Sequence, residues 1–308
     1  MTTPSPAPRC PVGAHIPVAG GLARTGLPYT DEVGAEAVQV FVANPRGWAT
    51  PVGDPRQDET FAAGCAERSL PAFVHAPYLI NFGSPTEATL ERSALSLWHS
   101  LRRGAAIGAR GVVVHTGSAV ADVPRDRALR QVGELVRPLL DQLDGLADRV
   151  GAVPDLLLEP TAGQGRSLCS LLTDLGPYLE VLEFHPRVGV CLDTCHAFAA
   201  GHDLAAPGGV DAAMTELVAA VGPDRLKLVH ANDSLDVCGA RRDRHQSIGT
   251  GHIGQQPFAD LLAHPVVRGV PWVVETPGGA AGHGGDVALL KKLRDQARRP
   301  AGSRGRPS

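Results

Sequence analysis

Short apolar runs recur along the whole chain, separated by longer segments with helical patterns. Eight runs are of this kind: Val12–Ile16, Ala37–Val42, Ala72–Ala76, Gly111–His115, Asp155–Glu159, Val188–Asp193, Leu226–His230 and Trp272–Glu275. None has the clean alternation of a half-solvated strand, so each fits a buried parallel strand. Helical patterns lie between them, for example in Glu87–Ile107, Arg125–Arg149 and Asp211–Val221. Strands and helices that alternate in this way predict parallel βαβ units.

Eight such units favour a single α/β domain, a closed (β/α)8 TIM barrel, over a doubly wound sheet. The GxGxxG turn of a dinucleotide-binding sheet does not follow the first run. A length of 308 residues would also allow two domains, but no obvious linker divides the chain. We therefore expect a flexible N-terminus over 1–10, the barrel over 11–293 and a basic flexible tail over 294–308. The tail arginines that could attract DNA non-specifically are Arg294, Arg298, Arg299, Arg304 and Arg306.

Six consecutive runs, from the third to the eighth, have His, Glu or Asp at or next to their last position, after two apolar residues. These residues are His75, His115, Glu159, Asp193, His230 and Glu275. In a barrel the strand ends converge on the C-terminal face, where active sites lie. Converging carboxylates repel one another unless they are protonated or matched by cations. Three imidazoles with three carboxylates suit zinc or manganese, so the pattern predicts a metal centre with its site at this face.

Two further pairs extend the candidate set. His196 follows Asp193 by three residues at a strand-to-helix junction, and Asp243 precedes His245 by two in a Gly-rich loop. Taken alone, Asp193 could be a helix N-cap and the loop a solvated charged turn. Together with the strand ends they make nine candidates, which exceed the shell of one ion and suit two or three ions with a bridging carboxylate.

Composition narrows the function classes. With 29 Lys and Arg against 32 Asp and Glu, the net charge of −3 excludes a generally basic DNA-coating protein but allows a local basic cleft. The six cysteines form no CxxC pair, which indicates mostly free, buried thiols in a reducing, cytoplasmic setting. Cys191 and Cys195 flank Asp193, but we expect them to be small apolar residues rather than ligands. We expect neither a signal peptide nor a membrane span.

The motifs around these residues resemble endonuclease IV-type apurinic/apyrimidinic (AP) endonucleases from about Gly13 to about Leu293. The resemblance is carried by GAHIP, VQVFVANPRGW, VHAPYLINFGSP, VVVHTGS, LLLEPTAGQG, VCLDTCHAFAAGHD, VHANDS, DRHQSIGTGHIG and VVETPG. It implies a monomeric enzyme with three Zn²⁺, or Mn²⁺ in part of the site, that acts on double-stranded DNA in base excision repair. The implied reaction is hydrolysis 5′ to abasic sites, leaving a 3′-hydroxyl and a 5′-deoxyribose phosphate, with removal of blocked 3′ ends as a second activity.

The resemblance also implies roles for individual residues. His75, His115 and Glu159 would hold the first zinc, Glu159, Asp193, His230 and Glu275 the second, and His196, Asp243 and His245 the third. Glu159 would bridge two ions, and Glu159, His115 and Glu275 would be the catalytic residues. The DNA contacts would come from Asn44, Arg46 and Trp48, from Tyr78 and Leu79, and from the phosphate-binding arginines Arg241, Arg242 and Arg244. Gly47 departs from the family, which usually has Gln there, and this weakens the wedge that fills the gap in the duplex.

Two other interpretations stay open at this point. A sugar isomerase or epimerase on the related barrel would use the second ligand set for one or two ions and leave the third set without a role. A non-catalytic damaged-DNA-binding protein would keep the fold without turnover. Counting the bound metal ions and measuring incision of abasic DNA distinguish the three.

Overall fold

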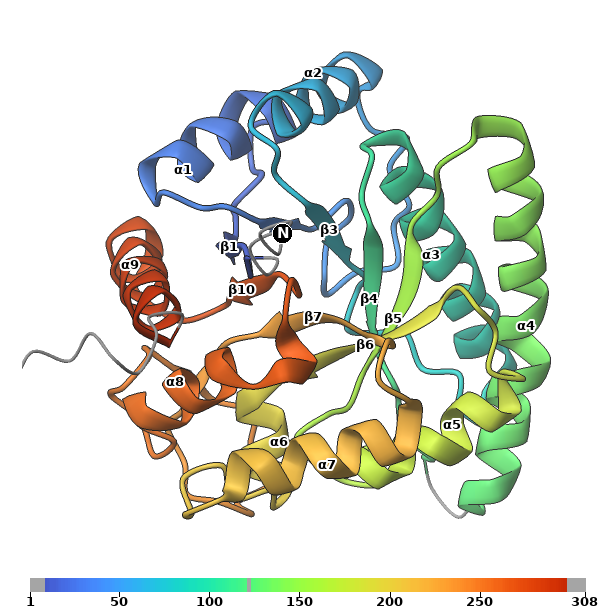
Figure 1. The fold of residues 1–308 in the computed structure, drawn as a ribbon. Helices are drawn as coiled ribbons and strands as arrows, with labels where there is room; N and C mark the ends of the chain where they lie inside the picture. The colour runs from blue at the N-terminus through green and yellow to red at the C-terminus, as the bar shows by residue number, and fades with distance from the viewer. Residues whose placement is uncertain (1–8, 121–122, 298–308) are drawn as a thin grey trace, which may run out of the picture.

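A closed barrel of parallel strands stands at the centre of the molecule, and helices surround it (Figure 1). The computed structural model describes residues 9–120 and 123–297. The barrel strands are β1 (Val12–His15), β2 (Val38–Val40), β3 (Ala72–His75), β4 (Gly111–His115), β5 (Asp155–Glu159), β6 (Val188–Asp193), β7 (Leu226–His230) and β10 (Trp272–Val274). The barrel closes where β1 pairs with β10, and every predicted run contains one of these strands. The predicted TIM barrel is therefore confirmed.

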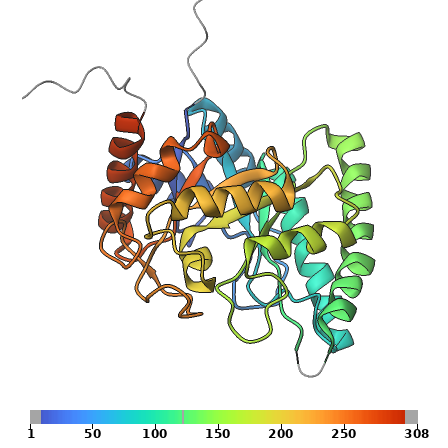
Figure 2. The ribbon, with the colours of Figure 1, turned by 60° about the horizontal axis from the view of Figure 1, so that its bottom comes forward.

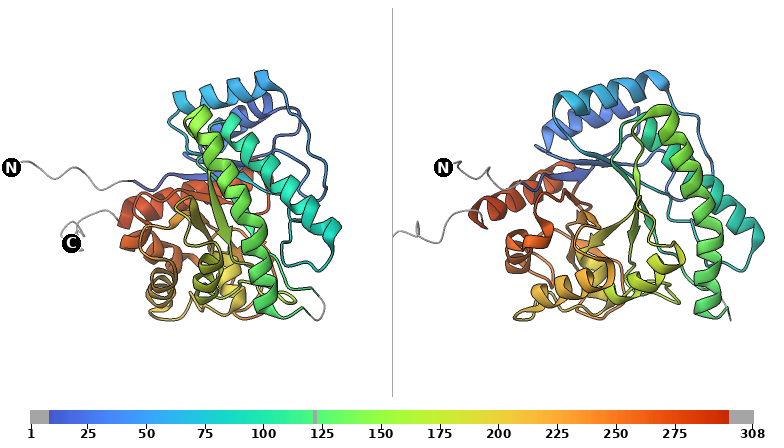
Figure 3. Two further views of the ribbon diagram at one scale, coloured as in Figure 1. Left: turned by 90° about the vertical axis from the view of Figure 1, so that its right-hand side faces the viewer. Right: turned by 45° about the vertical axis from the view of Figure 1, so that its right-hand side comes forward.

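The helices form the outer layer, and the three predicted from their patterns are present. They are α1 (Leu27–Glu32), α2 (Pro55–Glu67), α3 (Glu87–Ala106), α4 (Arg125–Val150), α5 (Leu175–Val181), α6 (Thr194–Ala200), α7 (Gly209–Val221), α8 (Gln255–Ala263) and α9 (Gly279–Ala297). Figure 2 shows α8 and α9 side by side, and Figure 3 shows the same for α3 and α4. Short helical turns lie at Leu22–Gly26, Leu172–Asp174 and Pro265–Val267, and the strands β8 (Asp233–Ser234) and β9 (His245–Gln246) form a hairpin outside the barrel.

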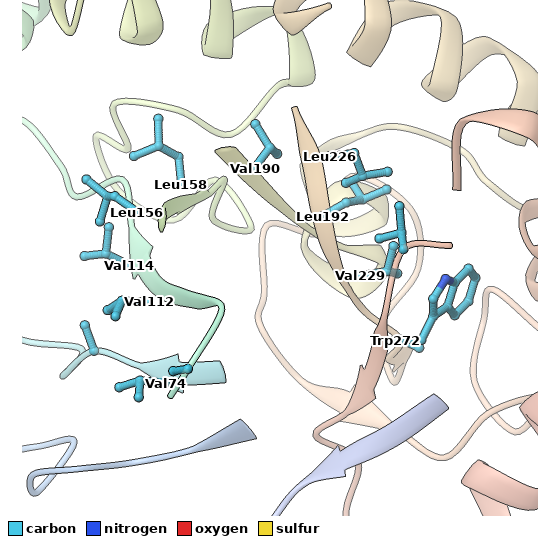
Figure 4. Close-up of a cluster of buried hydrophobic side chains, with 14 of the residues drawn as sticks. Val74, Val112, Val114, Leu156, Leu158, Val190, Leu192, Leu226, Val229 and Trp272 are labelled. Atoms are coloured by element: carbon cyan, nitrogen blue, oxygen red, sulfur yellow. The ribbon is translucent and has the colours of Figure 1, made fainter. Parts of the chain in front are cut away.

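The strands are apolar on both faces, which is why the sequence runs do not alternate. The outward side chains pack between the barrel and the helices, as Figure 4 shows for Val112, Leu156 and Val190, which are fully buried or nearly so. Burying each such side chain contributes roughly 1.5–3 kcal/mol. The inward side chains form a separate apolar layer that consists of Ala37, Phe73, Val113, Leu157, Cys191, Leu228 and Val273. On β1 this layer has Gly13, because a Cβ there would lie 1.6 Å from the carbonyl oxygen of Ala37.

The C-terminal helix reaches further than the sequence indicated. Helix α9 ends at Ala297, and Arg294 within it is 1% exposed, where it pairs with Glu36 and donates to the carbonyl oxygen of Cys10 at 2.8 Å. Arg294 therefore belongs to the packed barrel and is not part of a tail that attracts DNA. The other tail arginines (Arg298, Arg299, Arg304 and Arg306) lie outside the described residues. Among the helices of the described residues, none is long and apolar enough to cross a membrane.

Candidate metal centre

Every barrel strand places one polar side chain above the apolar layer, toward the C-terminal face. Side chains two residues apart on a strand point to the same side, and each of these residues follows an inward residue by two positions. The eight are His15, Gln39, His75, His115, Glu159, Asp193, His230 and Glu275. Sequence reasoning identified six of them and missed His15 and Gln39. The same two-residue step, applied to Gly13 and Ala37, would have found both.

Glu159 lies at the centre of this polar layer and is fully buried. Its Oε2 is 3.2 Å from His75 Nε2 and 3.4 Å from His115 Nε2, while its Oε1 is 3.0 Å from His230 Nδ1. One carboxylate therefore faces two sets of neighbours with different oxygens, which is the arrangement a bridging ligand needs. The first candidate group is His75, His115 and Glu159, and the second is Glu159, Asp193, His230 and Glu275, with the ligand atoms of each group within 4.8 Å of one another.

A third candidate group lies beside the first two and consists of His196, Asp243 and His245. The Oδ1 of Asp243 is 3.2 Å from His196 Nε2 and 3.1 Å from His245 Nε2. Both imidazole nitrogens are buried, and neither makes a hydrogen bond of regular geometry with the oxygen that it faces. An orphaned buried polar atom is costly, and a cation held between the two nitrogens and the carboxylate would remove that cost. The donor set of this group therefore fits a metal ion.

Backbone carbonyls hold one ring nitrogen in each of three candidate histidines. The contacts run from His75 Nδ1 to the Ala76 oxygen (2.7 Å), from His196 Nδ1 to the Pro160 oxygen (3.1 Å) and from His245 Nδ1 to the Glu275 oxygen (3.3 Å). A nitrogen that donates to a carbonyl leaves the lone pair of the other nitrogen for a cation. In all three rings the remaining Nε2 faces a carboxylate of the candidate groups.

Asp193 caps helix α6 and also belongs to the second candidate group. Its Oδ1 accepts from the backbone N–H of His196 at 2.8 Å, and its Oδ2 accepts from Asn232 Nδ2 at 2.7 Å. The same Oδ2 lies 3.5 Å from His245 Nε2. The two interpretations of Asp193 offered by the sequence are thus compatible. Asn232, which sequence reasoning missed, also accepts from the backbone N–H of Glu275 at 2.8 Å and so ties two candidate ligands together.

The imidazoles and carboxylates of the site shift one another's pKa values. Burial alone would lower the pKa of His245, but the charge of Asp193 and the hydrogen bond to Asp243 raise it to about 9. Burial likewise opposes the charged form of Glu275, yet the charge of His230 and the hydrogen bond from His15 hold the pKa of Glu275 well below its usual range. Protonated histidines thus balance the buried carboxylates in the metal-free protein, and cations that bind here must displace their protons.

The two cysteines that flank Asp193 keep their protons. Burial raises the pKa of both Cys191 and Cys195 to about 12. The Sγ of Cys195 lies within 4.8 Å of potential ligand atoms of Asp193 and His245, but it donates to the carbonyl oxygen of Arg244 at 3.7 Å. Because the thiolate and not the thiol binds metals, this geometry favours the apolar interpretation of both cysteines. No disulfide joins any two of the six cysteines, all of which lie in the described residues.

The candidate DNA contacts after β2 and β3 lie on two loops that are joined to each other. The backbone N–H of Tyr78 donates to the carbonyl oxygen of Pro45 at 2.9 Å, and the Asn44 side chain accepts from the N–H of Arg46 at 2.9 Å. Tyr78 and Leu79 are 44% and 36% exposed.

The Tyr78 ring stacks on His115 of the first group with a centroid distance of 5.4 Å, so these loops stand at the edge of the site. Trp48, on the loop after β2, lines a cleft of about 600 Å³ beside α3 together with Trp98 and His99.

The three candidate phosphate-binding arginines share the loop that carries Asp243. Arg244 binds both oxygens of Asp236 through its Nε and one terminal nitrogen, and Arg242 lies 3.9 Å from Asp236. The Arg242 side chain is 66% exposed and that of Arg244 is 49% exposed. Arg241 adopts a left-handed φ of 52° and donates its backbone N–H to Ala199. Of the two arginines near Asp236, Arg242 is the more open to a phosphate.

Comparison with known proteins agrees with this geometry. Residues 27–293 match the family model described as a xylose isomerase-like TIM barrel. The chain is 64% identical over 288 residues to the probable endonuclease 4 of Streptomyces coelicolor, a match that covers 94% of this chain and 96% of that protein.

Two solved structures place the fold in a wider context. The crystal structure of endonuclease IV from Thermus thermophilus matches with a TM-score of 0.77 and 30% identity over 94% of this chain and 100% of that chain. The structure of L-ribulose 3-epimerase matches with a TM-score of 0.70 over 97% of this chain and all of that one, but at 15% identity it shows the shared fold alone. The chain therefore belongs to the endonuclease 4 family, on a xylose isomerase-like TIM barrel.

Proposed function

We propose that this chain is a zinc-dependent AP endonuclease that hydrolyses the phosphodiester bond 5′ to abasic sites in double-stranded DNA. The products are a 3′-hydroxyl and a 5′-deoxyribose phosphate, and the same site removes blocked 3′ ends during base excision repair. The protein acts as a monomer in the cytoplasm. Each of the three candidate groups holds one Zn²⁺, and Mn²⁺ can replace it in part.

The third group carries the proposal. A barrel isomerase or epimerase needs only the second group, which would leave His196, Asp243 and His245 without a role. Yet these three residues place two buried nitrogens around one carboxylate oxygen, and neither nitrogen makes a hydrogen bond of regular geometry. Such an arrangement raises the free energy of the folded protein unless a cation binds between these atoms. A third cation also suits a phosphodiester, whose negative charge must be neutralised during attack.

In the proposed hydrolysis, the bound ions and the side chains of the site have different roles. When bound, the cations supply Lewis-acid stabilisation of the phosphate and lower the pKa of water toward neutrality. Glu159 and His230, which are fully buried, form the closed floor of the site. The side chains of His115 and His245 are 21% and 19% exposed and form its open edge. Substrate phosphate therefore enters over the first and third groups, where Tyr78 and Arg242 also lie.

Damage recognition follows from the cost of extrusion. An abasic nucleotide has no stacked base, so turning it into a pocket costs less than flipping an intact nucleotide. Tyr78 and Leu79 are exposed beside His115 and can occupy the base step that the extruded nucleotide leaves. Arg46 on the adjoining loop can enter the minor groove, and the arginines near Asp236 can contact phosphates.

The test is incision of a labelled duplex that contains one tetrahydrofuran abasic analogue. The zinc-loaded protein should nick the strand 5′ to the analogue and leave an intact duplex of the same sequence uncut. Specific binding without a nick would favour the non-catalytic damage-binding protein. One or two bound ions without incision, together with turnover of a ketose, would favour the isomerase.

A further inference from the structure

Two members of the polar layer, His15 and Gln39, have no place among the candidate ligands. Gln39 is fully buried on β2, in a run that is otherwise apolar. A buried amide without partners would cost about 1–3 kcal/mol for each unsatisfied group. We therefore expect the buried Gln39 amide to make specific hydrogen bonds inside the barrel.

The Gln39 amide contacts two candidate ligands of the second group at once. Its Oε1 lies 2.8 Å from His230 Nε2, and its Nε2 lies 2.7 Å from Glu275 Oε1. The same amide nitrogen lies 2.9 Å from His15 Nδ1, which is itself 3.2 Å from Glu275 Oε1. Because a carboxylate only accepts, the nitrogen of the amide must face Glu275, and this leaves the amide oxygen to accept from His230.

These contacts determine which atoms the two ligands present to the site. Because Nε2 of His230 donates to Gln39, Nδ1 is the nitrogen that faces the second group, 3.0 Å from Glu159 Oε1 and 3.3 Å from Glu275 Oε2. The Nδ1 lone pair becomes available to a cation when that cation displaces the Nδ1 proton. Glu275 is held through Oε1, which leaves Oε2 directed into the group. The backbone carbonyls serve His75, His196 and His245 in the same way, but His230 depends on a side chain from another strand.

We infer that Gln39 is a positioning residue of the metal centre, which sets the tautomer of His230 and the orientation of Glu275 and thereby strengthens ion binding in the second group. The inference rests on the proposed metal-dependent function. Partners of metal-bound histidines at this distance typically change ion affinity by 10- to 100-fold when they are removed. Among the described residues, the side-chain hydrogen bonds of Gln39 reach His15, His230 and Glu275 and no residue of the first or third group, so its effect should be confined to one ion.

Two substitutions separate the two contacts. Gln39→Met keeps the volume of the side chain but leaves His230 Nε2 without a partner and leaves Glu275 Oε1 with His15 Nδ1 alone, 3.2 Å away. Gln39→Glu keeps an acceptor for His230 but places a second carboxylate 2.7 Å from Glu275. The matched control is Gln131→Met, because the Gln131 amide is partly buried and donates to the carbonyls of Phe82 (2.7 Å) and Ser84 (2.8 Å) away from the candidate groups.

The experiment measures the zinc retained by each full-length protein after equilibration with a graded chelator series. A second readout is the visible spectrum of the Co²⁺-loaded protein, which reports coordination geometry and not stability. We expect both Gln39 variants to lose one ion at 10- to 100-fold lower chelator strength and to change the cobalt spectrum. Gln131→Met should match the wild type in both readouts.

Three results would overturn parts of this account separately. If the wild type binds its ions and both Gln39 variants retain them equally well, the role of Gln39 is refuted and the proposed function is untouched. If the wild type binds no divalent ion, both are refuted. If Gln39→Met fails to fold without metal, Gln39→Glu decides, since equal retention by that variant refutes the role of Gln39.

Discussion

The hairpin that carries Asp243 and His245 of the third candidate group depends on one buried carboxylate, and removing this carboxylate is a sharp test of the structure. Asp233 on β8 is fully buried. Its two oxygens accept from five backbone N–H groups, those of Ser234 (2.8 Å), Gly249 (2.9 Å), Gly251 (3.1 Å), Ile253 (2.9 Å) and Gly254 (3.2 Å). Four of the five lie in the Gly-rich loop that follows His245, so this carboxylate holds the loop against the barrel.

The size of the effect follows from the contacts. In Asp233→Asn one acceptor oxygen becomes an NH₂ group, which faces at least two backbone N–H groups in either orientation of the amide. These are Ser234 and Ile253 at the Oδ1 position, or Gly249 and Gly251 at the Oδ2 position. Each orphaned buried donor costs about 1–3 kcal/mol, so the free energy of unfolding should fall by about 2–6 kcal/mol. The third ion should also be lost at lower chelator strength, because the same loop supports His245.

Guanidinium denaturation of the metal-free protein measures the stability change. Asp211→Asn is the control, because the Asp211 side chain is 82% exposed and its substitution should change stability by less than about 0.5 kcal/mol. Gly251→Ala tests the same contact independently, since a Cβ there would lie 2.5 Å from Asp233 Oδ1. If Asp233→Asn unfolds within about 0.5 kcal/mol of the wild type, the proposed support of the loop is wrong.

Three further predictions address the core, the pH response and the recognition loop. Leu157→Ala in the inward layer should cost about 2–5 kcal/mol by denaturant unfolding, and a cost below about 1 kcal/mol would contradict close packing there. Burial alone would raise the pKa of Glu36, but its hydrogen bond from Arg294 and the nearby positive charges lower it overall. The stability from this pair should be complete above the ordinary carboxyl pKa of about 4.3 and fade as the pH falls through the lowered value. Glu36→Gln should therefore lower the melting temperature at neutral pH and less so in acid, whereas an equal drop at both would count against the pairing. Gly47→Gln should fold normally, because a Cβ there meets Asn44 at 3.4 Å. It should bind an abasic duplex several-fold more tightly by fluorescence anisotropy, and unchanged affinity would remove Gly47 from recognition.

The barrel could be predicted because both faces of its strands are covered, which leaves a signal in the sequence. Continuous apolar runs such as Val112–Val114 have no other simple explanation in a chain of strands and helices. The ligand-type residues could be predicted for a related reason. Each lies at the C-terminal end of its strand, and in a barrel these ends converge on the same face.

Contacts between distant strands could not be predicted in this way. Gln39 lies within its run and has no partner nearby in sequence, since His230 and Glu275 reach it only after the barrel closes. Arg294 lies in a basic segment whose composition is typical of a flexible tail. Its burial depends on pairing with Glu36, which lies 258 residues earlier. Charge alone does not reveal which arginine pairs with a carboxylate that is distant in sequence.

The account depends most directly on incision by the zinc-loaded protein and its Glu159→Gln variant. Glu159 is the one residue shared by the first and second groups, so its loss removes the bridge while the barrel layers below remain packed. We predict that the wild type nicks a tetrahydrofuran duplex 5′ to the analogue, and that Glu159→Gln folds but loses several orders of magnitude in rate. Near-normal incision by Glu159→Gln, or no nick by micromolar wild type with zinc present, would contradict the central claim.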